Sequence, residues 1–273
     1  MAYLERDSGN ESGKRIYFED YGSGASAVLL IHGWGASVRT WDFNLNALRS
    51  AGHRVVLLDH RGCGSSDKDF EDVSIEAIAS DVVALVNHLS LERVILNGWS
   101  LGGAVAMQAA ADLGSTCVGI VSTCGATPAY IQKPDYPHGG DPAAMPETIA
   151  AMEANRAEFL WGLTQGVAAK PLGDATLRWL WQIFMEGSPA AGASLAALGP
   201  LDQRELLKGL KCPMLVCVGG QDAVVDPDIP RSVPQFNQNA RVHEFSECGH
   251  APHMEDAPTY NQALIEFIGE CLQ

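Results

Sequence analysis

A serine at position 100 stands between two glycines, where a predicted strand meets a predicted helix. The segment Gly98 to Gly102 reads GWSLG; the apolar run 93–97 precedes it and a helical pattern at 101–113 follows. So tight a turn leaves no room for side chains two positions before or after the serine, which explains both glycines. The turn would push the Ser100 hydroxyl out at the edge of the sheet. The pattern predicts a nucleophile, and a serine hydroxyl needs a base to act as one.

Two later loops supply a base and an acid for that serine. His250 and Asp222 each follow a predicted strand, and the chain order is serine, aspartate, histidine. Imidazole titrates near neutrality, so His250 can accept the Ser100 proton. Asp222 would hold the imidazole in the required tautomer and stabilise the imidazolium. This order differs from the two orders found in serine proteases.

Asp226 and His253 are alternatives to Asp222 and His250, and a third residue, His32, is expected to be structural. Asp226 lies four residues after Asp222, and we expect it to cap a helix that starts near residue 228. His253 lies three residues after His250, and we do not expect it to be the base. His32 follows the predicted strand 27–31. We expect its ring to support the loop that begins there.

The elements that would position these residues alternate along the chain. Predicted strands lie at residues 16–21, 27–31, 54–58, 93–97, 118–123, 213–218 and 241–245. Predicted helices lie at about 40–50, 74–90, 101–113 and 256–270. This alternation favours an α/β fold with a mostly parallel sheet and helices on both faces. The stretch 127–208 contains no convincing strand; instead it predicts helices from Pro146 to about Gly166 and from Asp174 to Glu186.

Several ordered motifs resemble those of the α/β-hydrolase fold family over nearly the whole chain. They are the elbow around Ser100, the segment His32-Gly33-Trp34-Gly35, the segment 59–66 (DHRGCGSS), and Gly249-His250-Ala251-Pro252 with Glu255 and Pro258. The resemblance implies an eight-stranded, mostly parallel sheet with an inserted helical cap. The core would be residues 1–126 and 209–273, and the cap would be residues 127–208. We expect the segment 59–66 to be a structural turn.

The resemblance also implies how the site works. The backbone N–H groups of Trp34 and Leu101 would form an oxyanion hole, and Leu101 also begins a helix whose positive end favours an anion. The cap would roof the Ser100 site and shape a pocket for acyl groups or rings. Aromatic residues are the expected substrate contacts. These candidates are Trp99, Trp161, Trp181 and Phe184.

Composition limits the other functions. The chain has 273 residues, with 18 Lys and Arg against 33 Asp and Glu, a formal net charge of −15. That balance argues against binding to nucleic acids or to anionic membranes. The seven cysteines show no metal-ligand spacing, so we expect no metal, no other cofactor and a reducing, cytoplasmic compartment. The N-terminal segment has no apolar core of the kind found in secretory leaders. The oligomeric state stays open.

The leading hypothesis is a serine hydrolase that cleaves apolar carboxylic esters or lactones through an acyl-enzyme on Ser100. The alternatives are a carbon–carbon bond hydrolase of ring-cleavage products and a perhydrolase, or cofactor-free haloperoxidase. A binding module that keeps the fold without turnover is a fourth possibility. In this family, dehalogenases and epoxide hydrolases carry aspartate at the elbow, so serine at position 100 excludes them.

Overall fold

The central strands are apolar on both sides, as expected for parallel strands covered by helices. In β3 (Ser26–Ile31), Ala27, Leu29 and Ile31 belong to one buried hydrophobic cluster, and Val28 and Leu30 belong to a second. Successive side chains of a strand point to opposite faces, so one sheet separates two cores. Each core is completed by helices that pack on its face.

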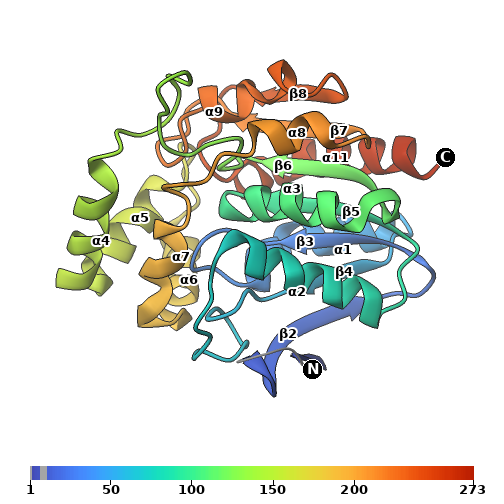
Figure 1. Cartoon of the computed structure of the whole chain (residues 1–273), viewed down its shortest axis with the longest axis horizontal. Helices are drawn as coiled ribbons and strands as arrows, with labels where there is room; N and C mark the ends of the chain where they lie inside the picture. The colour runs from blue at the N-terminus through green and yellow to red at the C-terminus, as the bar shows by residue number, and fades with distance from the viewer. Residues whose placement is uncertain (1, 7–10) are drawn as a thin grey trace.

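The computed structural model describes residues 2–6 and 11–273 and contains one eight-stranded sheet (Figure 1). The strand order is β1-β2-β4-β3-β5-β6-β7-β8. β2 pairs antiparallel with β1 and β4, and all other neighbours are parallel. This confirms the predicted fold class. The remaining strands are β1 (Ala2–Arg6), β2 (Lys14–Tyr21), β4 (Val55–Leu58), β5 (Arg93–Trp99), β6 (Cys117–Thr123), β7 (Met214–Gly219) and β8 (Ala240–Phe245).

Helices cover both faces of the sheet (Figure 1). The apolar sides of α2 (Ile75–His88) and α3 (Leu101–Leu113) fill one core. Residues of α1 (Asp42–Ser50) and α11 (Ala257–Leu272) fill the other. The shorter helices are α8 (Arg204–Gly209), α9 (Asp228–Arg231) and α10 (Pro252–Glu255). None of the helices in the described part of the chain is both long and apolar enough to span a membrane.

The stretch between β6 and β7 contributes a separate group of helices, which stand together at one end of the sheet (Figure 1). They are α4 (Ala144–Ala154), α5 (Arg156–Gly166), α6 (Asp174–Glu186) and α7 (Gly192–Ala196). The single helix predicted from Pro146 to Gly166 is therefore wrong. Asn155 leaves helical geometry, with φ −152° and ψ 82°, and its side chain caps α5 by accepting from the Glu158 N–H. An asparagine can hydrogen-bond to nearby backbone in this way and so favours caps over helix interiors.

Candidate active site

The turn at Ser100 is strained, and the glycines around it are required by close backbone contacts. Ser100 ends β5 and precedes α3 with φ 57° and ψ −122°, a conformation that is rare for a residue with a side chain. A Cβ on Gly98 would lie 2.0 Å from the Gly102 carbonyl oxygen. A Cβ on Gly102 would lie 2.5 Å from the carbonyl oxygens of Ile31 and His32. Strand and helix can join at this angle only when both positions lack side chains.

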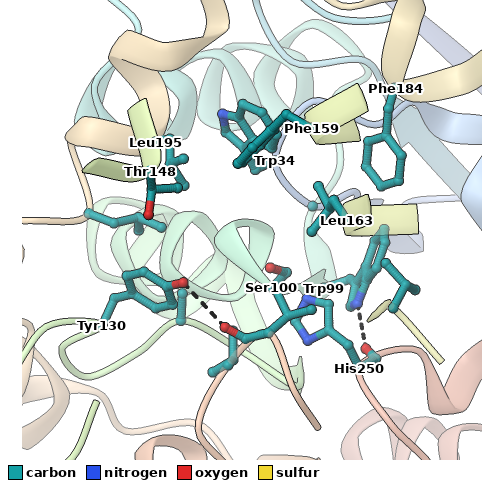
Figure 2. Close-up of a pocket in the computed structure, with 16 residues that line it drawn as sticks. Trp34, Trp99, Ser100, Tyr130, Thr148, Phe159, Leu163, Phe184, Leu195 and His250 are labelled. Carbon is teal, nitrogen blue, oxygen red and sulfur yellow. Dashed lines mark hydrogen bonds between the residues drawn. The ribbon is translucent and has the colours of Figure 1, made fainter. Parts of the chain in front are cut away.

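Backbone hydrogen bonds hold the strained turn from both sides. The Ser100 N–H donates to the Thr123 carbonyl at 2.9 Å, and the Ala126 N–H donates to the Ser100 carbonyl at 3.0 Å. The Ser100 side chain lines a cavity together with His250 (Figure 2). Within residues 2–6 and 11–273, no hydrogen bond links the two side chains. Such contacts are often long without substrate and tighten when it binds.

The structure joins Asp222 to His250 and buries both. The His250 Nδ1–H donates to Asp222 Oδ2 at 2.7 Å, and the side chains are 3% and 1% exposed. The other carboxylate oxygen accepts the N–H groups of Val224 and Val225 at 2.8 and 2.9 Å. These bonds fix the carboxylate, and the carboxylate keeps the proton of the neutral imidazole on Nδ1. Nε2 is then left with a lone pair, as a base requires.

The loop that carries His250 is itself held by two neighbours. The His250 N–H donates to the Val167 carbonyl at 2.8 Å, just beyond α5. The Trp99 indole N–H donates to the His250 carbonyl at 2.8 Å. Trp99 directly precedes Ser100, so the two loops are tied through this indole. Trp99 is buried and also lines the cavity.

Asp226 and His253, the alternatives to Asp222 and His250, do not take part in this pair. Asp226 Oδ1 accepts the N–H of Asp228, the first residue of α9, at 2.9 Å on the surface, whereas the N-cap position of α9 is Pro227 and not Asp226. The His253 ring is fully buried and contacts Trp41 and Trp99, with centroid separations of 4.7 and 4.9 Å. Burial lowers the pKa of His253 to about 3, because the charged ring would lose its hydration. In the geometry described here, Asp222 and His250 are the pair next to Ser100.

The loop after β3 approaches the same serine. A Cβ on Gly33 would come within 3.1 Å of the Ser100 Cβ, and the next residue, Trp34, lines the cavity. His32 holds this loop: its Nδ1–H donates to the Gly33 carbonyl at 2.7 Å, and its Nε2 accepts the His60 N–H at 2.9 Å. Burial lowers the pKa of His32 to about 4, so the ring stays neutral and keeps this tautomer near neutral pH.

A cavity of about 100 Å³ opens above Ser100 (Figure 2). One water molecule needs only about 10–15 Å³ of such space, so the cavity has room for a small organic group such as an acyl chain. Among the described residues that line it, none is an aspartate, glutamate, lysine or arginine. The lining residues are Gly33, Trp34, Trp99, Ser100, Ala126, Tyr130, Thr148, Phe159, Leu163, Val167, Phe184, Leu195, Leu198, Val224, Val225 and His250.

Two of the four expected aromatic contacts do not reach this cavity. Trp99 and Phe184 line it, whereas Trp161 and Trp181 line a shallow hollow on another side of α5 and α6. Their rings meet edge to face with centroids 5.9 Å apart, and the Trp181 indole N–H donates to the Ala157 carbonyl. On α5, Trp161 lies two residues after Phe159, which lines the cavity, and residues two apart on a helix point to different sides.

Sequence reasoning missed several contributors to the cavity. Phe159 and Leu163 are four residues apart on α5 and share the face that the cavity exposes. Tyr130 lies in the loop after β6, and its hydroxyl donates to the Val224 carbonyl at 3.2 Å, next to the Asp222 turn (Figure 2). The i, i+4 pair was visible in the sequence, but the loop position of Tyr130 gave no signal.

Comparison with known proteins identifies the fold family of the chain. A family model described as the alpha/beta hydrolase fold matches residues 26–257. The chain is 27% identical to a non-heme haloperoxidase from Rhodococcus erythropolis, over 94% of this chain and 96% of that protein. It is 26% identical to a bifunctional esterase/perhydrolase from Acinetobacter calcoaceticus, over 94% and 97% of the two chains. An esterase structure from Exiguobacterium antarcticum superposes with a TM-score of 0.90 at 25% identity, over 94% of this chain and 96% of that one. The chain belongs to the α/β hydrolase fold family.

Proposed function

We propose that this protein is a serine hydrolase that cleaves uncharged carboxylic esters or lactones through an acyl-enzyme on Ser100. The observation that carries the proposal is the buried Asp222–His250 pair beside a strained serine in one cavity. His250 Nε2 takes the Ser100 proton while Oγ attacks the ester carbonyl. The imidazolium then gives that proton to the leaving alkoxide. Water attacks the acyl-enzyme in the same way and releases the carboxylic acid.

The tetrahedral intermediates carry an oxyanion, and we propose that two backbone N–H groups near Ser100 receive it. Leu101 is the first residue of α3, where N–H groups have no acceptor within the helix and the helix dipole is positive. Trp34 follows Gly33 on the loop beside Ser100. We assign the oxyanion hole to the N–H groups of Trp34 and Leu101. Donors that already point at the developing charge lower the barrier without reorganising.

The substrate class follows from the lining of the cavity. A carboxylate in this apolar space would lose its hydration without a cation to pair with, at a cost of several kcal/mol. Products of oxidative ring cleavage carry a carboxylate, so the carbon–carbon hydrolase alternative fits poorly. The small cavity favours short acyl groups.

We propose that the helices in 127–208 act as a cap over the Ser100 site, because Phe159, Leu163 and Phe184 from these helices line the cavity.

Perhydrolysis is the second candidate, and the named relative that carries both activities favours it. The chemistry uses the same acyl-enzyme, with hydrogen peroxide in place of water as the second nucleophile. The products are then a peracid and the regenerated serine.

We also propose a cytoplasmic location. All seven cysteines are free thiols, and a reducing compartment keeps thiols in that state.

Hydrolysis of p-nitrophenyl acetate by the purified protein and by Ser100→Ala tests the proposal. The wild type should release p-nitrophenolate with saturation kinetics, and the variant should lose about 10³-fold or more of kcat while melting at a similar temperature. Peracetic acid formed from the same ester and hydrogen peroxide measures the second candidate. A folded variant that retains a tenth of the wild-type rate would remove Ser100 from the mechanism.

A further inference from the structure

A buried thiol lies directly behind the Asp222–His250 pair and has no role in the proposed acyl transfer. Cys124 follows β6, is 0% exposed and has a positive φ of 45°. Its N–H donates to the Cys217 carbonyl at 2.8 Å, which fixes the backbone there. Its Sγ contacts the carbonyl oxygen of Gly249, the residue before His250, at 3.7 Å. The thiol is therefore held beneath the loop that carries the histidine.

Cys124, Asp222 and His250 offer three metal-binding atoms in one place. The sulfur, a carboxylate oxygen and a ring nitrogen all lie within 4.8 Å of one another. Around a tetrahedral zinc ion, with bonds of about 2.0–2.3 Å, neighbouring ligand atoms are about 3.5 Å apart. The Asp222–His250 contact is shorter than this, at 2.7 Å, so that pair must separate slightly for an ion to enter. Small shifts of side chains would complete a three-ligand set, and the Gly249 carbonyl or a water molecule can supply a fourth ligand.

We propose that Cys124, Asp222 and His250 form an inhibitory binding site for a thiophilic divalent cation of the Zn²⁺ or Cd²⁺ class. One thiolate, one carboxylate and a neutral imidazole together offset a charge of +2, so the occupied site is electrically neutral. Neutrality matters because all three side chains are buried, where an uncompensated charge is expensive. The sulfur ligand selects such ions over Mg²⁺ and Ca²⁺, which prefer oxygen.

Occupancy of this site is incompatible with the proposed catalytic cycle. A metal bond to His250 Nδ1 replaces the Nδ1–H that now donates to Asp222. The imidazole then carries its proton on Nε2, and the thiol proton of Cys124 passes to solvent. With Nε2 protonated, the ring has no lone pair with which to accept the Ser100 proton. Inhibition rests on the proposed function, whereas metal binding does not.

Cadmium titration of the purified chain tests the site without any substrate. The wild type should bind one Cd²⁺ with thiolate-to-metal charge-transfer absorption in the ultraviolet. Esterase activity should fall in parallel and return on addition of EDTA. Cys124→Ser should lose the absorption and require at least about tenfold more Cd²⁺ for half-inhibition of its own basal activity. Cys217→Ser is the matched control, because Cys217 is equally buried on the neighbouring strand and lies outside the ligand set.

Two further variants distinguish binding at this site from binding elsewhere on the chain. Ser100→Ala should keep the absorption, since the serine is not a ligand, and His250→Ala should lose it. The absorption therefore reports on the site even if the chain hydrolyses no ester. Cys124→Ala, checked by circular dichroism, replaces the serine variant if that one does not fold. Equal Cd²⁺ binding by the wild type and the folded Cys124 variant would overturn the proposal, as would a wild type that binds no Cd²⁺ with sulfur.

Discussion

At the scale of single residues, the Asp222 carboxylate is occupied on both oxygens. Oδ2 accepts from His250 Nδ1, and Oδ1 accepts from the Val224 and Val225 N–H groups. The carboxylate therefore cannot rotate away from the imidazole without losing backbone bonds. Asp226, four residues further on, accepts the Asp228 N–H with its Oδ1 on the surface. The two aspartates share a loop but have different roles.

We expect Asp222→Asn to lower kcat on p-nitrophenyl acetate by about 10³- to 10⁴-fold. An amide cannot stabilise the imidazolium, and it favours the wrong imidazole tautomer. Asp226→Asn should change kcat less than about twofold, because the amide oxygen of asparagine can accept the same Asp228 N–H and the side chain does not contact His250. Steady-state rates of both folded variants make the comparison. The reverse ranking would move the acid to Asp226.

Phe159 and Trp161 give a matched test of the pocket wall, since both are partly buried on α5 but only Phe159 lines the cavity. Phe159→Ala should raise kcat/KM for p-nitrophenyl hexanoate relative to the acetate by about tenfold, because the cavity lengthens. Trp161→Ala should leave that ratio unchanged. Competition between the two esters measures the ratio directly. An equal response of both variants would show that the cavity does not bind the acyl chain.

At the scale of elements, Glu255 on α10 joins the histidine loop to the segment between α5 and α6. Its Oε2 accepts the N–H groups of Gly249, Ala169 and Lys170 at 2.8–2.9 Å. Its Oε1 accepts the Ala251 N–H at 3.1 Å. One carboxylate therefore holds the loop around His250 against the segment that joins α5 to α6.

Glu255→Gln should destabilise the protein by about 2 kcal/mol and also lower kcat, because an amide keeps one acceptor oxygen and turns a donor toward backbone N–H groups. Asp256→Asn is the control: Asp256 is the next residue, and its exposed pair with Lys170 at 3.3 Å contributes little to stability because solvent screens it. Chemical denaturation and initial rates give both quantities. Similar losses in the two variants would show that Glu255 does not hold the loop.

Some helices and strands could be predicted from the sequence, and others could not. Runs such as 93–97 are apolar throughout and lie beside glycine-rich turns, so the central strands and the Ser100 elbow were predictable. β1 (Ala2–Arg6) was not, because an edge strand with Glu5 and Arg6 has little apolar pattern. The break at Asn155 and the orientation of Trp161 depend on how the helices pack over the cavity. Packing between distant segments leaves no local signal in a single sequence.

At the scale of the whole molecule, buried histidines link stability to pH. His32, His60 and His253 are at most 2% exposed, and burial lowers the pKa of His32 to about 4, that of His253 to about 3 and that of His60 well below its ordinary value. An unfolded histidine titrates near pH 6.5, so below that pH the unfolded chain takes up protons that the folded chain does not. Burial also raises the pKa of Asp59 to about 6, and this shift acts in the opposite direction.

We therefore expect the free energy of unfolding to fall as the pH drops from about 6.5 toward 4. Each histidine contributes up to about 1.4 kcal/mol per pH unit, and Asp59 offsets about one of the three. His60→Leu should reduce the slope by about that single-group amount. Urea denaturation at a series of pH values gives the slope. A flat profile, or an unchanged slope in the variant, would contradict the neutral burial of these rings.

We propose above that Ser100 forms a covalent intermediate with the help of His250 and Asp222. Labelling with diethyl p-nitrophenyl phosphate tests it most directly, because the reagent leaves a stable diethylphosphoryl group on an activated serine. Intact-protein mass spectrometry should show one added group on the wild type, and peptide mapping should place it on Ser100. His250→Ala should label at least about 10³-fold more slowly, since the serine has lost its base. A wild type that stays unlabelled, or a label on another residue, would contradict the assignment of Ser100 as the nucleophile.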